Sequence, residues 1–247
     1  MTQSSDTTLD GRSTWSNEAR TLLHFIYEFW TRHRRPPNLA DVRSALGLRH
    51  RDVRRLYREL QRGFAVVAAE HLIGLGLVKA PPFSATPTAV ACYQDGEFVS
   101  YLGCAAEALT VGCLPWFADR DLEIRSYCAC CYAPLRLRVR EQQVVEVLEG
   151  TLPVVSVLGS PWEWEEGVPA DRVCDSFHFV LDAEHAERLE IATARRGVLL
   201  TTEQLAAFAE STARRRAWDP DWPPIHMNGA AIVARMAELG VDVTGWQ

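Results

Sequence analysis

The sequence predicts an α+β protein: a small N-terminal helical, winged-helix-like bundle, followed by a mixed or antiparallel sheet domain with flanking helices. Up to residue 62 the apolar residues recur with a helical period, and after Pro81-Pro82 they fall in short runs typical of strands. A length of 247 residues and a hydrophobic share of 47% allow a sizeable core. No apolar run approaches the roughly 18 residues of a membrane span.

Three helices are predicted before residue 62. The first, 18–30, carries an apolar stripe from Leu22 to Trp30. The second runs from 39 to 46, because Asn38 is a suitable N-cap and Gly47 a suitable terminator. The third follows directly and buries one face that includes Val53 and Leu60.

The third helix also carries five arginines, and these leave two interpretations open. It is either a recognition helix that lies on phosphates or the solvated face of a docking bundle. Residues 1–62 hold 12 basic against 7 acidic side chains, a net +5, so the other 185 residues sum to −11. Because Asp52 and Glu59 interleave with the arginines, we expect no specific duplex binding at physiological salt. The arginines are Arg51, Arg54, Arg55, Arg58 and Arg62.

The second half of the chain predicts a meander of strands interrupted by helices. Asp95-Gly96 indicates a hairpin turn, and the strict alternation over 135–140 indicates one buried and one wet face. The predicted strands are 88–93, 97–101, 122–127, 135–139, 144–148, 152–158 and 177–181. The predicted helices are about 104–111, 183–196, 202–216 and 229–239.

These patterns divide the chain into four parts. Residues 1–17 are expected to be a disordered polar tail, and 18–80 to form the winged-helix-like domain. Residues 81–216 are expected to form the main α+β domain, and 217–247 a C-terminal extension that packs on it. The tail shows no apolar segment of the export-signal type, so we expect a cytoplasmic protein.

Seven cysteines, an odd number with no export signal, favour free thiols over a disulfide framework. Cys128, Cys130 and Cys131 form a Cys-x-Cys-Cys cluster after a predicted strand. The cluster does not offer the two Cys-x-x-Cys pairs that a structural zinc site prefers. A soft metal such as Cu(I) would suit it, yet adjacent cysteines in a strand point to opposite faces, so inert thiols are the favoured interpretation.

Cys104 and Glu107 open a predicted helix, where a spacing of three places thiol and carboxyl on one face. The positive end of the helix dipole is expected to lower the pKa of Cys104. A buried, inert cysteine is the alternative interpretation. Cys174 stands at a predicted loop–strand junction, seventy residues downstream.

Three motifs, in this order, resemble the alkylmercury (organomercurial) lyase family: Tyr-Leu-Gly-Cys104-Ala-Ala-Glu107, then Ser126-Tyr-Cys128, then Cys174-Asp-Ser-Phe-His178-Phe. The resemblance runs from about Leu22 to Arg214. It implies that Cys104 and Cys174 are the mercury-binding cysteines and that Glu107 occupies the place of the catalytic aspartate. It also implies that Cys128 is the family's third, structural cysteine.

The sequence departs from the family pattern in three places. Glu107 replaces an aspartate and extends the acid by one methylene. Asp175 stands where many members have a second adjacent cysteine. A longer acidic and aromatic segment, 159–167, replaces the family's cover loop, and we expect its Trp162 and Trp164 to close a pocket.

The resemblance implies a lyase that cleaves carbon–mercury bonds by protonolysis. Two thiolates suit the soft, nearly linear mercuric ion, and Glu107 can take a thiol proton and return it to carbon. No organic cofactor is expected, only a free small-molecule thiol as metal acceptor. The expected partner is a small organometallic or other small molecule, with no membrane and no nucleic acid. The alternatives are a family-like enzyme with a changed, non-mercury substrate and a metal-responsive DNA-binding regulator.

Overall fold

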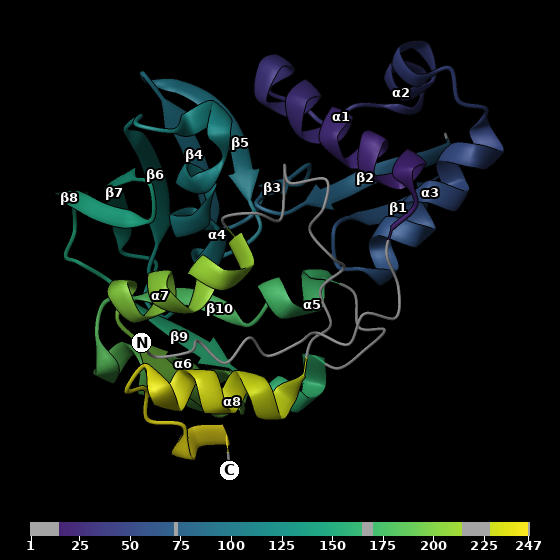
Figure 1. Ribbon diagram of the computed structural model, residues 1–247. Coiled ribbons are helices and arrows are strands. Elements are labelled where there is room, and N and C mark those ends of the chain that lie inside the picture. Colours follow the sequence, from purple (N-terminus) through teal and green to yellow (C-terminus); the bar gives the residue numbers. More distant parts are fainter. Residues whose placement is uncertain (1–14, 72–73, 165–169, 214–227, 247) are drawn as a thin grey trace, which may run out of the picture.

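The structure, a computed structural model, describes residues 15–71, 74–164, 170–213 and 228–246 (Figure 1). It contains a large antiparallel sheet, a small sheet and helices around both, so the predicted α+β class is confirmed. Figure 1 shows the N-terminal helices gathered at one end of the molecule, away from the small sheet. The predicted linker after Arg216 falls largely outside the described residues. None of the helices described is long and apolar enough to cross a membrane.

The first helix, α1 (Asn17–His33), extends the predicted helix by one residue at its start and three at its end. Ser16 caps its N-terminus, and the Ser16 amide donates a hydrogen bond to the Glu59 carboxylate. Trp15 is 5% exposed and belongs to the core. The predicted disordered tail is therefore wrong for its last three residues, because a buried indole and a capping hydroxyl attach them to the bundle. The earlier part of that tail falls outside the described residues.

Helices α2 (Leu39–Leu46) and α3 (His50–Arg62) complete the bundle. The bounds of α2 agree with the prediction, because the side chain of Asn38 caps its first turn. Gly47 ends it with a left-handed φ of 66°, a conformation that glycine adopts without strain. Helix α3 buries the predicted face against α1 and α2.

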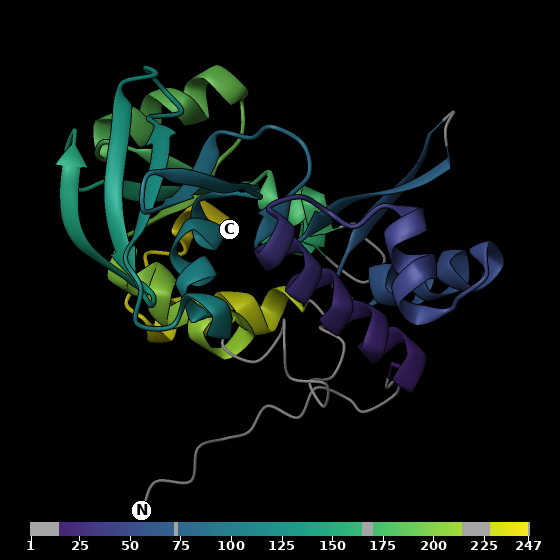
Figure 2. The ribbon, with the colours of Figure 1, turned by 90° about the horizontal axis from the view of Figure 1, so that it is seen from above.

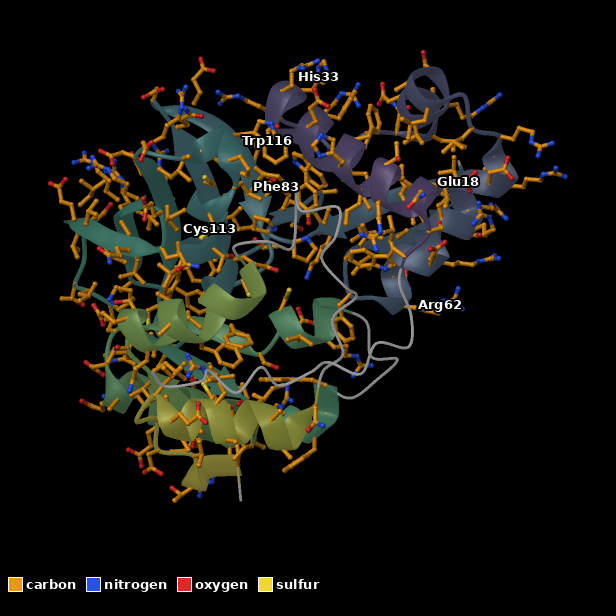
Figure 3. All side chains as sticks on the ribbon, in the orientation of Figure 1. Glu18, His33, Arg62, Phe83, Cys113 and Trp116 are labelled. Carbon is orange, nitrogen blue, oxygen red and sulfur yellow. The ribbon has the colours of Figure 1, made fainter. Side chains whose placement is uncertain are left out.

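Acidic side chains lie among the arginines of α3. Arg55 pairs with Glu18, and Arg54 lies 3.3 Å from Glu70. Figure 3 shows Glu18 near the start of α1, beside α3, and Arg62 at the end of α3. Since each acid lowers the positive potential around its arginine, this surface is a weaker attractor for phosphates than its arginine count suggests.

Eight antiparallel strands form the large sheet in the order β1-β2-β3-β5-β4-β6-β7-β8. Five of them begin and end within two residues of the prediction. The first three were not predicted, because their glycines, alanines and cis Pro81-Pro82 turn interrupt any strand-like alternation. The bounds are β1 Val67–His71, β2 Gly74–Ala80, β3 Phe83–Ser84, β4 Val90–Gln94, β5 Glu97–Leu102, β6 Leu122–Tyr127, β7 Pro134–Arg140 and β8 Gln143–Glu149.

The hairpin of β1 and β2 reaches from the large sheet toward the N-terminal helices (Figure 2). At the junction Trp30 stacks on Phe83 with ring centroids 5.3 Å apart, and the Tyr27 hydroxyl donates to the Pro81 carbonyl at 2.6 Å. Figure 3 shows Phe83 and Trp116 beside α1, on its side toward the sheet. These aromatic contacts fix the helical bundle to the sheet.

The small sheet has the order β10-β9-β11, with β9 Val154–Leu158, β10 Phe177–Val180 and β11 Gly197–Leu200. Strand β11 was not predicted. Its Gly197 lies so close to β9 that a Cβ atom would stand 2.3 Å from the Val157 carbonyl oxygen. The absent side chain, which weakened the strand signal, is what allows this close pairing.

The helices of the second half cover both sheets. Helix α4 contacts β4 and β5 of the large sheet and β10 of the small sheet, so it lies between the two. Helix α8, predicted in the C-terminal extension, contacts the short helix η3. The bounds are α4 Ala105–Thr110, η1 Val111–Cys113, η2 Pro115–Phe117, η3 Pro161–Trp164, α5 Ala170–Cys174, α6 Ala183–Thr193, α7 Thr202–Ala213, α8 Gly229–Glu238 and η4 Thr244–Trp246.

Candidate active site

Two of the predicted site residues lie where β5 passes into α4. Cys104 is the N-cap of α4, with extended backbone geometry, and Glu107 follows in the first turn. A residue three positions after the cap turns its side chain back over the same face of the helix. Both side chains are buried: Cys104 is 6% exposed and Glu107 is 9% exposed. The predicted common face of this thiol and this carboxyl is confirmed.

The third predicted site residue, Cys174, reaches the same place from α5. It is the last residue of that helix, and not part of a loop–strand junction as the sequence predicted. Its Sγ donates a hydrogen bond to Glu107 Oε1 at 3.2 Å. The Sγ atoms of Cys104 and Cys174 and a carboxylate oxygen of Glu107 all lie within 4.8 Å of one another. The fold therefore gathers two thiols and one acid into a single buried cluster.

Burial sets the protonation of both thiols. It raises the pKa of Cys104, although a hydrogen bond with Cys174 and, to a smaller extent, the amides of Glu107 and Ala106 oppose the shift by stabilising the thiolate. The predicted lowering by the helix terminus is therefore wrong, because desolvation outweighs those amides. A hydrogen bond with Cys104, burial and the Glu107 charge raise the pKa of Cys174 well above the usual 9.0. Both cysteines are thus thiols at neutral pH.

Gly103 is a site residue that the sequence analysis missed. A Cβ atom at this position would lie 2.0 Å from Glu107 Oε2 and 3.2 Å from Cys174 Sγ. Only glycine leaves room for the carboxyl of Glu107 in its observed position. The sequence does show a glycine directly before Cys104. That this position must lack a side chain becomes visible only in the fold, where the Glu107 carboxyl lies against it.

Lys79 is a second residue that the sequence analysis missed, because β2 was not predicted. Its side chain is buried, with 7% exposed. Its positive charge lowers the pKa of Cys174, against the stronger effects that raise it. Lys79 therefore favours the thiolate form of this cysteine.

The two tryptophans expected to close a pocket have different surroundings. Trp164 is 1% exposed, stacks on Phe177 and meets Trp246 edge to face. Its Nε1 donates to Ser176 Oγ at 3.3 Å, two residues after Cys174. Trp162 is half exposed beside Gly229 of α8. Trp164 is thus a core residue that supports the chain near Cys174, while residues 165–169 of the predicted cover segment fall outside the described residues.

The remaining predicted residues lie apart from the cluster. Asp175 is exposed, and His178 lies on β10, where burial lowers its pKa. Cys128 is fully buried just after β6 and belongs to a separate hydrophobic cluster. Among the residues that the structure describes, only Cys104, Glu107 and Cys174 form this group.

The cysteines should differ in their reactivity toward iodoacetamide at neutral pH. Cys131 is exposed, whereas Cys104 and Cys174 are buried with raised pKa values, so Cys131 should react at least about tenfold faster. Raising the pH should increase labelling of the buried pair as their thiolate fractions rise. Peptide mass spectrometry after timed labelling measures each site, and equal rates at Cys104 and Cys131 would contradict this order.

Comparison with known proteins shows the family of this chain. The sequence model of the family described as alkylmercury lyase matches residues 83–214, just over half of the 247 residues. The chain belongs to the alkylmercury lyase family. The matched segment of this family member contains all three residues of the buried cluster, Gly103 and Cys128. Helices α1–α3 and α8 lie outside it.

The fold of the family member also matches a solved structure, the mercury-bound form of MerB2. The TM-score is 0.63 at 18% sequence identity, and the match covers 83% of this chain and 93% of the other. The likeness in fold therefore extends beyond the segment that the family sequence model matches. No curated protein sequence gives a significant match.

Proposed function

We propose that this member of the alkylmercury lyase family cleaves carbon–mercury bonds by protonolysis, with Cys104 and Cys174 as mercury ligands and Glu107 as proton carrier. One observation carries the proposal: two buried thiols and a carboxylate lie within 4.8 Å of one another, with Cys174 donating to Glu107. The similar protein MerB2 is known in a mercury-bound form, which supports mercury as the metal of the substrate.

The two cysteines suit mercury because Hg(II) is soft and prefers two nearly opposed thiolate ligands. The amides at the start of α4 favour the thiolate of Cys104, so we assign the first attack on R–Hg–X to Cys104. Its thiol loses a proton, its sulfur binds mercury, and X leaves as HX. Lys79 then favours the second thiolate, at Cys174.

Glu107 controls the second proton. It accepts the proton of Cys174 along the observed hydrogen bond as that sulfur binds mercury. The carbon–mercury bond then breaks with its electron pair on carbon, and Glu107 returns the proton to that carbon. The sum is R–Hg–X plus two cysteine thiols giving R–H, HX and a mercuric bis-thiolate.

Release of mercury needs no organic cofactor in this proposal. Two molecules of a small free thiol displace the bis-thiolate and restore the cysteine protons. Because both protein sulfurs are buried, such an acceptor must enter the site one thiol at a time. The acceptor is thus a small molecule, and a second protein is not required.

The decisive test is release of arene from an aryl mercurial by the wild-type protein in excess thiol. We expect catalytic production of the arene, measured by gas chromatography, together with soluble mercuric thiolate. Buffer with the same thiol and protein denatured by heat are the controls. If the protein releases no more arene than these controls, the proposal is wrong. The alternative, in which the same thiols act on a changed, non-mercury substrate, would then be favoured.

We propose that the protein is a cytoplasmic enzyme and that its N-terminal bundle is a docking domain rather than a DNA-binding domain. Three helices followed by the β1–β2 hairpin support the winged-helix-like interpretation. Arg54 and Arg55 form ion pairs with Glu70 and Glu18, which lower the positive potential available to phosphates. This argues against the alternative of a DNA-binding regulator.

Gly103→Ala should lower the rate of arene release by about 10- to 100-fold, because the added methyl displaces the Glu107 carboxyl from the thiols. Shortening the acid should relieve this clash. We therefore expect Glu107→Asp to cost less in the Gly103→Ala background than in the wild type, a coupling that a double-mutant cycle measures. Additive losses would show that Gly103 does not act through Glu107.

A further inference from the structure

A second group of metal-ligand atoms lies outside the cluster of Cys104, Glu107 and Cys174. It combines Cys128 and Cys131, which follow β6, with His185 on α6. The sequence analysis placed these cysteines after the predicted strand 122–127 and judged the cluster by the alternation of side chains in a strand. In the structure they lie in a turn, where the Tyr132 amide donates to the Cys128 carbonyl at 2.8 Å. Such an α-turn spans the five residues 128–132 and brings positions i and i+3 to one side, so Cys128 and Cys131 form a pair with Cys-x-x-Cys spacing.

The ring of His185 has a hydrogen-bond partner at one of its two nitrogens. Asp182 caps α6, and its Oδ1 lies 2.7 Å from His185 Nδ1. A carboxylate that accepts from one ring nitrogen leaves the lone pair of the other, Nε2, free for a metal, as is common around histidine ligands.

The spacing of the three groups suits one small ion. A ring nitrogen of His185 and the two Sγ atoms all lie within 4.8 Å of one another. Ligand atoms in tetrahedral zinc sites lie roughly 3.6–3.8 Å apart, so shifts of about 1 Å close the site. Cys131 is exposed and His185 half-buried, which leaves a path for the ion and a water as fourth ligand.

We propose that Cys128, Cys131 and His185 bind one zinc ion, with Asp182 positioning the imidazole. The bound ion would join the turn after β6 to the first turn of α6. The same turn is already attached to the small sheet, because the Ala129 amide donates to the Phe179 carbonyl at 2.9 Å. Zinc binding replaces the two thiol protons, which pass to solvent, and involves no redox change.

The test uses the full-length protein with Cys104→Ser and Cys174→Ser, which removes the buried active-site thiols. Reduced, metal-free protein is titrated with Co(II), and a thiolate-to-cobalt charge-transfer band reports binding. We expect one equivalent of Co(II) with tetrahedral ligand-field bands, and displacement by one equivalent of Zn(II). No saturable binding would overturn the proposal, as would recovery of Cys128 and Cys131 as a disulfide from protein prepared with zinc.

Surface variants then identify the ligands without disturbing the core. Cys131→Ser and His185→Ala should each weaken Zn(II) binding at least about 100-fold, measured by competition with a chromogenic chelator. Asp182→Asn keeps the helix cap but weakens the contact to His185, so a loss of about tenfold is expected. Cys130→Ser, in the same turn, is the matched control and should bind like the parent. Loss in Cys130→Ser with retention in His185→Ala would overturn the assignment.

Discussion

Cys174→Ser should lower the rate of arene release from an aryl mercurial by at least about a thousandfold, roughly 4 kcal/mol in the activation barrier. Serine keeps the size of the side chain but offers a hard oxygen in place of a soft sulfur. With one thiolate, mercury keeps its carbon ligand and the carbon–mercury bond is not weakened. Cys104→Ser should have the same effect, since each sulfur supplies one of the two bonds that mercury needs.

Cys174→Ser and Cys104→Ser should also no longer retain Hg(II) in equilibrium dialysis when a monothiol competes for the ion. This measurement is made in a Cys131→Ser background, because the thiols of Cys128 and Cys131 would otherwise also hold mercury. Cys113→Ser is the matched control, a half-buried cysteine of η1 outside both ligand groups, and should cleave at the wild-type rate. Arene release by Cys174→Ser at a wild-type rate, with an intact circular dichroism spectrum, would remove Cys174 from the mechanism.

Glu107→Gln should slow arene release by about 10²- to 10⁴-fold in a single turnover, while the protein still binds the organomercurial. Glutamine has the shape of glutamate and can still accept the hydrogen bond of Cys174, but it cannot carry a proton to carbon. The aryl mercurial should therefore remain attached, which intact-protein mass spectrometry detects. Glu107→Asp should retain part of the activity, because it keeps an acid with a shorter reach.

Asp175→Asn is the matched control for this prediction. Asp175 is the acid next to Cys174 in sequence, yet its side chain is exposed and stands outside the buried cluster. Its replacement should leave the single-turnover rate unchanged. A normal rate in Glu107→Gln with a reduced rate in Asp175→Asn would transfer the proton step from Glu107 to Asp175.

The agreement between sequence and structure is closest where the signals are local. Asn38 and Gly47 determine both ends of α2, and the alternation over 135–140 determines β7, because capping and strand alternation act between neighbours in the chain. The strands β1, β2 and β11 were missed. Their glycines and alanines carry little periodic signal. Strands β1 and β2 pair with each other in a hairpin, and β11 pairs with β9, which is distant in the sequence.

For the site, the sequence by itself determined which residues to consider. The spacing of Cys104 and Glu107 placed a thiol and an acid on one face of a helix, and the ordered motifs pointed to Cys174. Each of these inferences needs only the chain order and the geometry of one helical turn.

Only the tertiary structure decided how these groups behave. The fold brings Cys174 of α5 to Cys104 and Glu107 of α4 and buries both thiols, so desolvation reversed the pKa shift that the helix terminus predicted for Cys104. The fold also brings the charge of Lys79 near Cys174 and places the Glu107 carboxyl where only a glycine at position 103 leaves room for it. In another part of the molecule it places His185 beside Cys128 and Cys131. Burial and contacts between distant segments depend on how the whole chain packs, which no local spacing in the sequence encodes.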